Sequence, residues 1–171
     1  MFWGDRLLSL DKSAGFLEEP NFRSAFEQIR GGHRYDQYNG PSTIAWRLHT
    51  LVWAANVALS LPEGDFVECG VFKGDMAWVV GQVVGLAPTT RQFHLYDSFD
   101  GFDPAQTSQE EFAELPGFLD YANAIYRAEG LWEGCRRAFA TCRTTICTRA
   151  ICPELWSVTA SLGKSLICTL T

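Results

Sequence analysis

Two short apolar segments, each followed by a turn, constrain the fold of this chain most strongly. The first is GDFVECGVFKGD at residues 64–75, and the second is LYDSFDG at residues 95–101. Four to five mainly apolar residues bounded by turn residues are typical of a strand buried on both faces. The apolar stretch between them, residues 76–84, predicts a helix. We therefore predict an α/β fold in which parallel strands at 66–69 and 92–96 are joined by that helix.

Helices are also predicted on both sides of this unit. One spans Phe16 to Arg30, with Asn21 as a candidate cap, and a longer one begins after the N-cap Ser42. Two more follow the second strand, at residues 118–128 and 131–140. This pattern predicts an N-terminal extension at 1–41, an α/β domain at 42–140 and an atypical tail at 141–171.

Composition excludes several classes of function. The formal net charge of −6 argues against nucleic acid as a partner, because phosphate binding depends on clustered Lys and Arg. The sequence contains no run of 18 apolar residues, so it predicts no membrane span. Its first residues also lack a signal-peptide pattern, and we therefore expect a cytoplasmic protein. The six cysteines include no CxxC pair with a nearby His, which argues against zinc.

The turn after the first strand suits an adenosyl cofactor better than a dinucleotide. Gly70 and Gly74 let the backbone turn sharply into a helix and approach a ligand closely. A dinucleotide site normally has the pattern GxGxxG, which leaves room for a pyrophosphate. Here Val71 and Phe72 fill the turn, and S-adenosylmethionine, which has no pyrophosphate, tolerates that bulk.

Acidic residues end both strands. Glu68 is placed to face a cationic amino group or sulfonium, and Asp97 to accept hydrogen bonds from ribose hydroxyls. The alternative is structural, because strand-end acids often cap helices and loops. Their occurrence on successive strand ends beside a glycine turn favours a cofactor site.

The segments FVECGVFKGDMAW and LYDSFDGF resemble the macrocin O-methyltransferase family, a branch of the class I S-adenosylmethionine-dependent methyltransferases. The resemblance covers residues 42–140 and implies a Rossmann-like fold, here the N-terminal part of a parallel sheet with flanking helices. It implies a cofactor loop formed by Glu68, Gly70, Val71, Phe72 and Gly74. Asp97 and Ser98 would hold the ribose, although Ser98 is equally typical of a turn. Family members methylate sugar or phenolic hydroxyls of natural products, commonly with a magnesium ion.

The tail departs from this family pattern at Thr141. Its 31 residues contain seven threonines, four cysteines, no Asp and a single Glu. In the family, the third and fourth strands lie in this part of the chain, and the fourth ends in a metal-binding Asp. The tail shows neither motif, so we expect both strands to be missing. The genetic code allows the same DNA to be read in a shifted frame, in which each codon takes the third base of one present codon and the first two of the next. The codons possible for residues 141–156 then include a reading LPNYHLHKGYLPGALE, and those for residues 167–171 include LHLDL. Both readings look like the missing family motifs. We therefore predict that the tail is off-frame and that the chain has no metal ligands.

The alternative is a genuine tail in which Thr144, Thr145, Ile146 and Thr148 form a β-branched strand.

The expected function is methyl transfer from S-adenosylmethionine to a hydroxyl of a small molecule. A truncated remnant that binds cofactor without turnover is the first alternative, and a nucleotide-binding oxidoreductase is the second. No catalytic base is assigned: His49 and His94 suit packing or surface roles, and His33, in a loop, is the least implausible candidate. The methyl acceptor and a homo-oligomeric state stay open.

Overall fold

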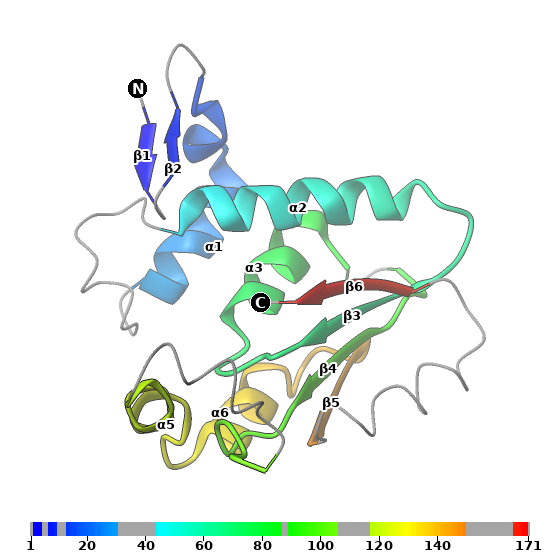
Figure 1. Cartoon of the computed structure of the whole chain (residues 1–171). Coiled ribbons are helices and arrows are strands. Elements are labelled where there is room, and N and C mark those ends of the chain that lie inside the picture. The colour runs from blue at the N-terminus through cyan, green and yellow to red at the C-terminus, as the bar shows by residue number, and fades with distance from the viewer. Residues whose placement is uncertain are drawn as a thin grey trace.

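A four-stranded parallel sheet forms the centre of the protein (Figure 1). The computed structural model describes residues 2–4, 7–9, 13–30, 44–86, 89–105, 117–149 and 166–170. The strands β3 (Asp65–Cys69), β4 (Phe93–Asp97), β5 (Thr145–Arg149) and β6 (Leu166–Leu170) lie in the order β5-β4-β3-β6. Every neighbouring pair is parallel. The prediction of an α/β fold with a central, buried first strand is confirmed.

The third and fourth strands, expected to be missing, are present. β5 pairs with β4 from Thr145 opposite Phe93, and β6 pairs with β3 from Leu166 opposite Asp65. A parallel ladder joins backbone to backbone, so the β-branched residues of the tail serve as well as any others. Residues 145–149 match the strand that a genuine tail predicts. The shift of reading frame in the underlying DNA stays a prediction.

The helices differ from expectation mainly at their ends. They are α1 (Pro20–Arg30), α2 (Ala45–Leu59), α3 (Asp75–Val84), α5 (Phe118–Tyr126) and α6 (Leu131–Ala138). A 3-10 turn, η1 (Gly15–Glu18), precedes α1, and β1 (Phe2–Gly4) pairs antiparallel with β2 (Leu7–Ser9). Asn21 is not a cap: α1 begins at Pro20, whose fixed φ and missing N–H suit a first helical position. Ser42, the predicted cap of α2, lies outside the described residues.

One face of the sheet is covered by a helical layer. α1 and α2 both pack on α3, and α6 contacts β5 (Figure 1). Phe66 and Leu95 point from the sheet into the same core cluster as Leu48 of α2 and Val79 of α3. Alternate residues of β3 and β4 form a separate small cluster, in which Val67 and Tyr96 are buried and Cys69 is half-buried. This alternation is the period of two expected for strands.

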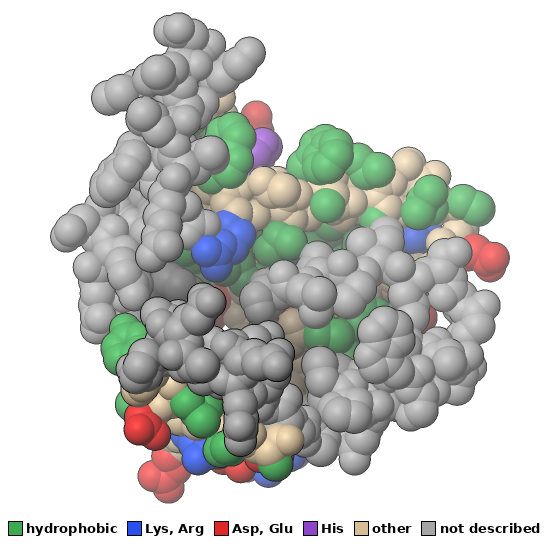
Figure 2. Space-filling view, in the orientation of Figure 1, with side chains coloured by type: hydrophobic (Ala, Val, Ile, Leu, Met, Phe, Trp, Pro, Cys, Tyr) green, Lys and Arg blue, Asp and Glu red, His purple; other side chains and the backbone are tan. Residues whose placement is uncertain are grey.

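Arg91 fixes the end of α2 against the start of the sheet. Its guanidinium donates hydrogen bonds to the carbonyl oxygens of Ala58 (3.1 Å), Gly64 (3.3 Å) and Leu61. Ala58 is in the last turn of α2, where carbonyls have no partner within the helix, and its oxygen also accepts a hydrogen bond from the amide of Leu61 (3.1 Å). Arg91 therefore adds to the pairing of this helix end and joins it to the turn before β3. The exposed side of α2 is mixed: Trp53 (62% exposed) and Val57 lie among exposed polar residues such as Thr50 and Asn56, and Leu61, just after the helix, is also exposed. Figure 2 shows apolar side chains on this surface of the helical layer.

Candidate functional site

The candidate site lies at the carboxyl edge of β3 and β4. Because the strands are parallel, the turn after β3 and the loop after β4 leave the sheet at the same edge (Figure 1). The amide of Gly70 donates to the carbonyl of Tyr96 (2.9 Å), which continues the ladder past the last residue of β3. The structure thus brings together the two acidic strand ends and the glycine turn that the sequence singled out.

Asp97 joins the two loops. Its Oδ2 accepts a hydrogen bond from the amide of Phe72 (2.7 Å), and its Oδ1 accepts one from the amide of Phe99 (2.6 Å). Both phenylalanines have positive φ, 53° and 52°, a conformation that is unusual outside glycine. Strain of this kind persists only where surrounding contacts impose it, and it is concentrated at functional sites. The Asp97 carboxylate supplies that contact to both residues at once.

The glycine turn is shaped by packing as well as by backbone conformation. Gly74 has φ of 86° and precedes α3 as its N-cap. A Cβ at this position would lie 2.7 Å from Cε2 of Phe139, so α6 approaches too closely for any side chain. Asp75 is the first residue of α3 rather than the cap that its type suggests, and no side chain bonds to the helix end as a cap. Val71 is buried and fills the turn.

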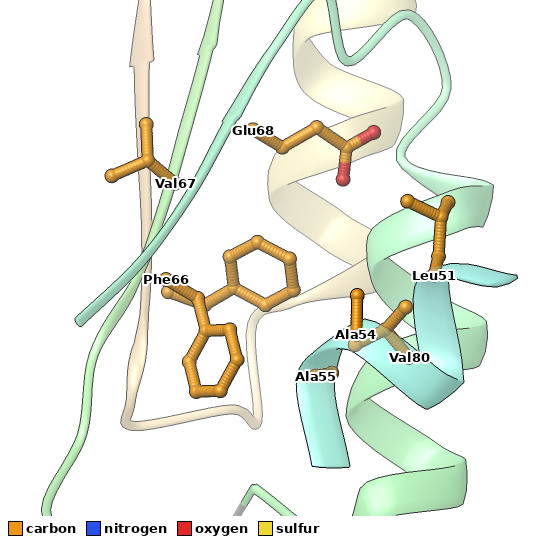
Figure 3. A pocket seen from close by; sticks show the side chains of 8 residues that line it. Leu51, Ala54, Ala55, Phe66, Val67, Glu68 and Val80 are labelled. Atoms are coloured by element: carbon orange, nitrogen blue, oxygen red, sulfur yellow. The ribbon is translucent and has the colours of Figure 1, made fainter. Parts of the chain in front are cut away.

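Glu68 is the least expected group of the site. Its side chain is only 2% exposed, and its Oε1 has no hydrogen-bond partner among the described residues. It lines a cavity of about 20 Å³ between the sheet and the helical layer (Figure 3). Figure 3 shows the carboxylate directed toward the helices, on the side of β3 opposite to Val67. The other lining side chains are apolar: Leu51, Ala54, Ala55, Phe66, Val67, Val80 and Phe93.

This environment changes the acidity of two carboxyl groups. Burial, together with the charges of Asp75 and Asp97, raises the pKa of Glu68 from 4.5 to about 8. Burial also raises the pKa of Asp75 to about 6, and the Lys73 ammonium opposes that rise. Glu68 is therefore mainly neutral at pH 7 in this structure. No local pattern around Asp75 predicts its burial, because that burial depends on how the helices pack on the turn.

Ser98 makes the contacts of a turn residue, which is one of the two roles predicted for it. Its hydroxyl donates to the carbonyl of Gly101 (2.9 Å) and accepts from the amide of Asp100 (3.2 Å). These two bonds close the loop after β4 locally.

Aromatic rings, which sequence reasoning did not assign to the site, surround the two loops. Phe72 packs edge-on against Tyr126 of α5, with ring centroids 5.2 Å apart, and Tyr126 also contacts Phe102. Phe99 packs on Trp132 of α6 at 5.1 Å. Their position between helices and loops is set by tertiary structure, so no local pattern predicts it.

The two histidines in the described part of the chain make packing or strand contacts. His94 is buried within β4, where Nε2 is 3.4 Å from Oδ2 of Asp65, at the opposite end of β3. His49 stacks on Phe16 at 4.2 Å, and burial lowers its pKa. Both observations fit the packing roles predicted for them. His33 lies outside the described residues.

The described part of the chain holds no group of three His, Cys, Asp or Glu side chains that could bind a metal ion. The acids at the candidate site therefore do not form a magnesium centre by themselves. None of the described helices is both long and apolar enough to span a bilayer. No protein-family model matches the sequence, and no curated protein matches it.

Proposed function

We propose that this chain binds S-adenosylmethionine or S-adenosylhomocysteine at the carboxyl edge of β3 and β4, as the cofactor-binding part of a class I methyltransferase. The observation that carries the proposal is the strand order. Counted from β3 along the chain, the sheet reads third, second, first, fourth. In open α/β sheets of this order, ligands bind outside the carboxyl ends of the strands where the order reverses, which here is between β3 and β6.

The two acidic side chains at this edge suit the two polar ends of the cofactor. Each Asp97 oxygen already accepts one backbone hydrogen bond and retains a second lone pair, which would accept a ribose hydroxyl. The unpartnered Oε1 of Glu68 would accept a hydrogen bond from the cofactor's amino group. Gly70, exposed at the turn, would allow close approach of the ligand. Val71, Phe72, Gly74 and Ser98 would maintain the loops rather than carry a charge.

The cofactor supplies an activated methyl group for transfer to a nucleophile. By the family resemblance, that nucleophile would be a hydroxyl of a sugar or phenolic small molecule. The proposed location is the cytoplasm, because the sequence has no apolar run long enough for a membrane span and its first residues lack a signal-peptide pattern. The chain's residues would contribute binding and orientation, which is a substantial part of catalysis for a group transfer. Because the described residues do not fit magnesium, no step is assigned to a metal ion.

A cofactor-binding remnant without turnover is the second candidate. It is favoured by the lack of a metal-binding group among the described residues and by the absence of Asp from the tail. An oxidoreductase is disfavoured, because bulky Val71 and Phe72 occupy the positions where a dinucleotide's pyrophosphate would lie.

Calorimetric titration tests the proposal directly. We expect S-adenosylhomocysteine to bind and NAD not to bind, and the variant Asp97→Ala to lose binding of the former. Asp120→Ala, which removes an exposed acid from α5, is the matched control. A folded wild-type chain that binds NAD, or that fails to bind S-adenosylhomocysteine, would refute the assignment. Binding without methyl transfer to any hydroxyl acceptor, with or without magnesium, would identify the remnant.

A further inference from the structure

Two thiols are in contact beneath the glycine turn. Sγ of Cys135, on α6, lies 3.9 Å from Sγ of Cys147, on β5. Cys135 is 1% exposed and Cys147 is half-buried. Sγ of Cys135 also lies 3.4 Å from the position that a Cβ on Gly74 would take. The pair therefore connects the third strand of the sheet to the helix that supports the turn.

The two sulfur atoms are in van der Waals contact, the arrangement from which a disulfide can form after a small movement. A disulfide requires an S–S distance of about 2.05 Å, so the two atoms would approach by roughly 2 Å in total. Disulfides are rare in reducing compartments except where they are transient and respond to oxidants.

The two thiols differ in reactivity. The hydrogen bond from Cys135 lowers the pKa of Cys147, and the nearby guanidinium of Arg136 acts in the same direction against burial. The same hydrogen bond, together with burial, raises the pKa of Cys135. Because the thiolate is the nucleophile, the half-buried Cys147 is the one that reacts first.

We propose that Cys135 and Cys147 form a reversible oxidation site that reacts with hydrogen peroxide. The Cys147 thiolate attacks one peroxide oxygen, the O–O bond breaks, and the hydroxide released takes up a proton to become water. The Cys147 sulfenic acid that results is attacked at sulfur by Cys135, which forms the S–S bond and releases a second water. Two thiols and one peroxide thus give one disulfide and two waters, and a dithiol reductant reverses the change. This inference does not depend on the proposed cofactor.

Trypsin separates the relevant cysteines, which makes the bond easy to locate. Cys135 lies in the peptide 128–136, Cys142 in 138–143 and Cys147 in 144–149. After treatment of the folded chain with one equivalent of peroxide, we expect a linked pair of the first and third peptides. Its mass should be lower by two hydrogen atoms, and the chain should lose two titratable thiols that dithiothreitol restores.

Variants and a denatured control make the assignment specific. Cys142→Ser should leave the link intact, and Cys147→Ser should abolish it and slow thiol loss at least tenfold. A link to residues 138–143 in the wild-type chain would overturn the proposal, as would no link between the first and third peptides. So would the same yield of that link when the chain is oxidised in concentrated urea, because the folded contact would then play no part. The three outcomes that would overturn the proposal are all measured on the wild-type chain, so a misfolded variant does not remove the test.

Discussion

Replacing Glu68 by Gln should stabilise the folded chain, by an amount that grows with pH. The folded protein has to keep a nearly inaccessible carboxyl group in an apolar cavity beside Asp75 and Asp97. At neutral pH the unfolded chain releases that proton easily, whereas the folded chain does not. The glutamine side chain has nearly the same shape as the protonated acid and never has to ionise.

The magnitude follows from the two pKa values. The pKa of Glu68 is about 8 in the folded state and 4.5 as the ordinary value, so the raised pKa lies on the folded side. The contribution of Glu68 to stability is therefore complete below pH 4.5 and is lost as pH rises through about 8. The slope over that window is about 1.4 kcal/mol per pH unit. The total loss is on the order of 5 kcal/mol, and between roughly pH 5.5 and pH 7.5 it is about 3 kcal/mol.

Urea unfolding followed by tryptophan fluorescence measures this effect. The difference in unfolding free energy between Glu68→Gln and the wild-type chain should rise by about 3 kcal/mol across that pH range. Titration of Asp75 occurs in both proteins and largely cancels in the difference. Glu63→Gln, at an exposed position just before β3, should give a difference that does not vary with pH. A pH-independent difference for Glu68→Gln as well would refute the assignment of Glu68 as a buried acid that is neutral at pH 7.

Three further predictions concern the same edge of the sheet. If the amino group of S-adenosylhomocysteine bonds to ionised Glu68, its affinity should rise about tenfold per pH unit up to about pH 8 in calorimetric titration, and Glu68→Gln should remove that dependence. Asp97→Asn should cost about 1–3 kcal/mol in urea unfolding, because an NH₂ group would face a backbone N–H; an unchanged midpoint would contradict this. Gly74→Ala should lower the free energy of unfolding by about 1–3 kcal/mol more than Gly85→Ala does. Both glycines have positive φ, but only at Gly74 would the added Cβ clash, with the ring of Phe139. Equal losses of stability would contradict this.

Local patterns located the central part of the fold well. The strands predicted at 66–69 and 92–96 are observed as β3 and β4 within one residue, and the helix between them begins one residue early. Short apolar segments bounded by Gly, Pro and polar residues carry this information within a few neighbours along the chain. The position of Asp97 at the end of β4 follows from the same local reading.

The interactions of the site depended on contacts between distant segments. Asp97 bonds to Phe72, 25 residues earlier, and nothing about a phenylalanine indicates the positive φ that this bond accompanies. The depth at which Glu68 and Asp75 are buried follows from the packing of helices on the turn. Sequence reasoning therefore located both acids at the ends of neighbouring strands, but it gave no indication that Glu68 is buried and mainly neutral. Their role in binding a cofactor stays a prediction.

The two strands of the tail add backbone pairing to the sheet but no acidic side chain to the candidate site. β5 and β6 complete the ladder through backbone hydrogen bonds, which nearly any sequence without proline can form. The proposed cofactor site instead requires particular side chains at the strand ends, which in this proposal are Glu68 of β3 and Asp97 of β4. β5 ends in Arg149 and β6 ends in Leu170, so neither added strand brings an acid to the edge. The four strands thus form one parallel sheet that keeps the groups proposed to hold a cofactor. A metal-binding acid of the kind common in the resembled family is encoded only if the predicted shift of reading frame is real.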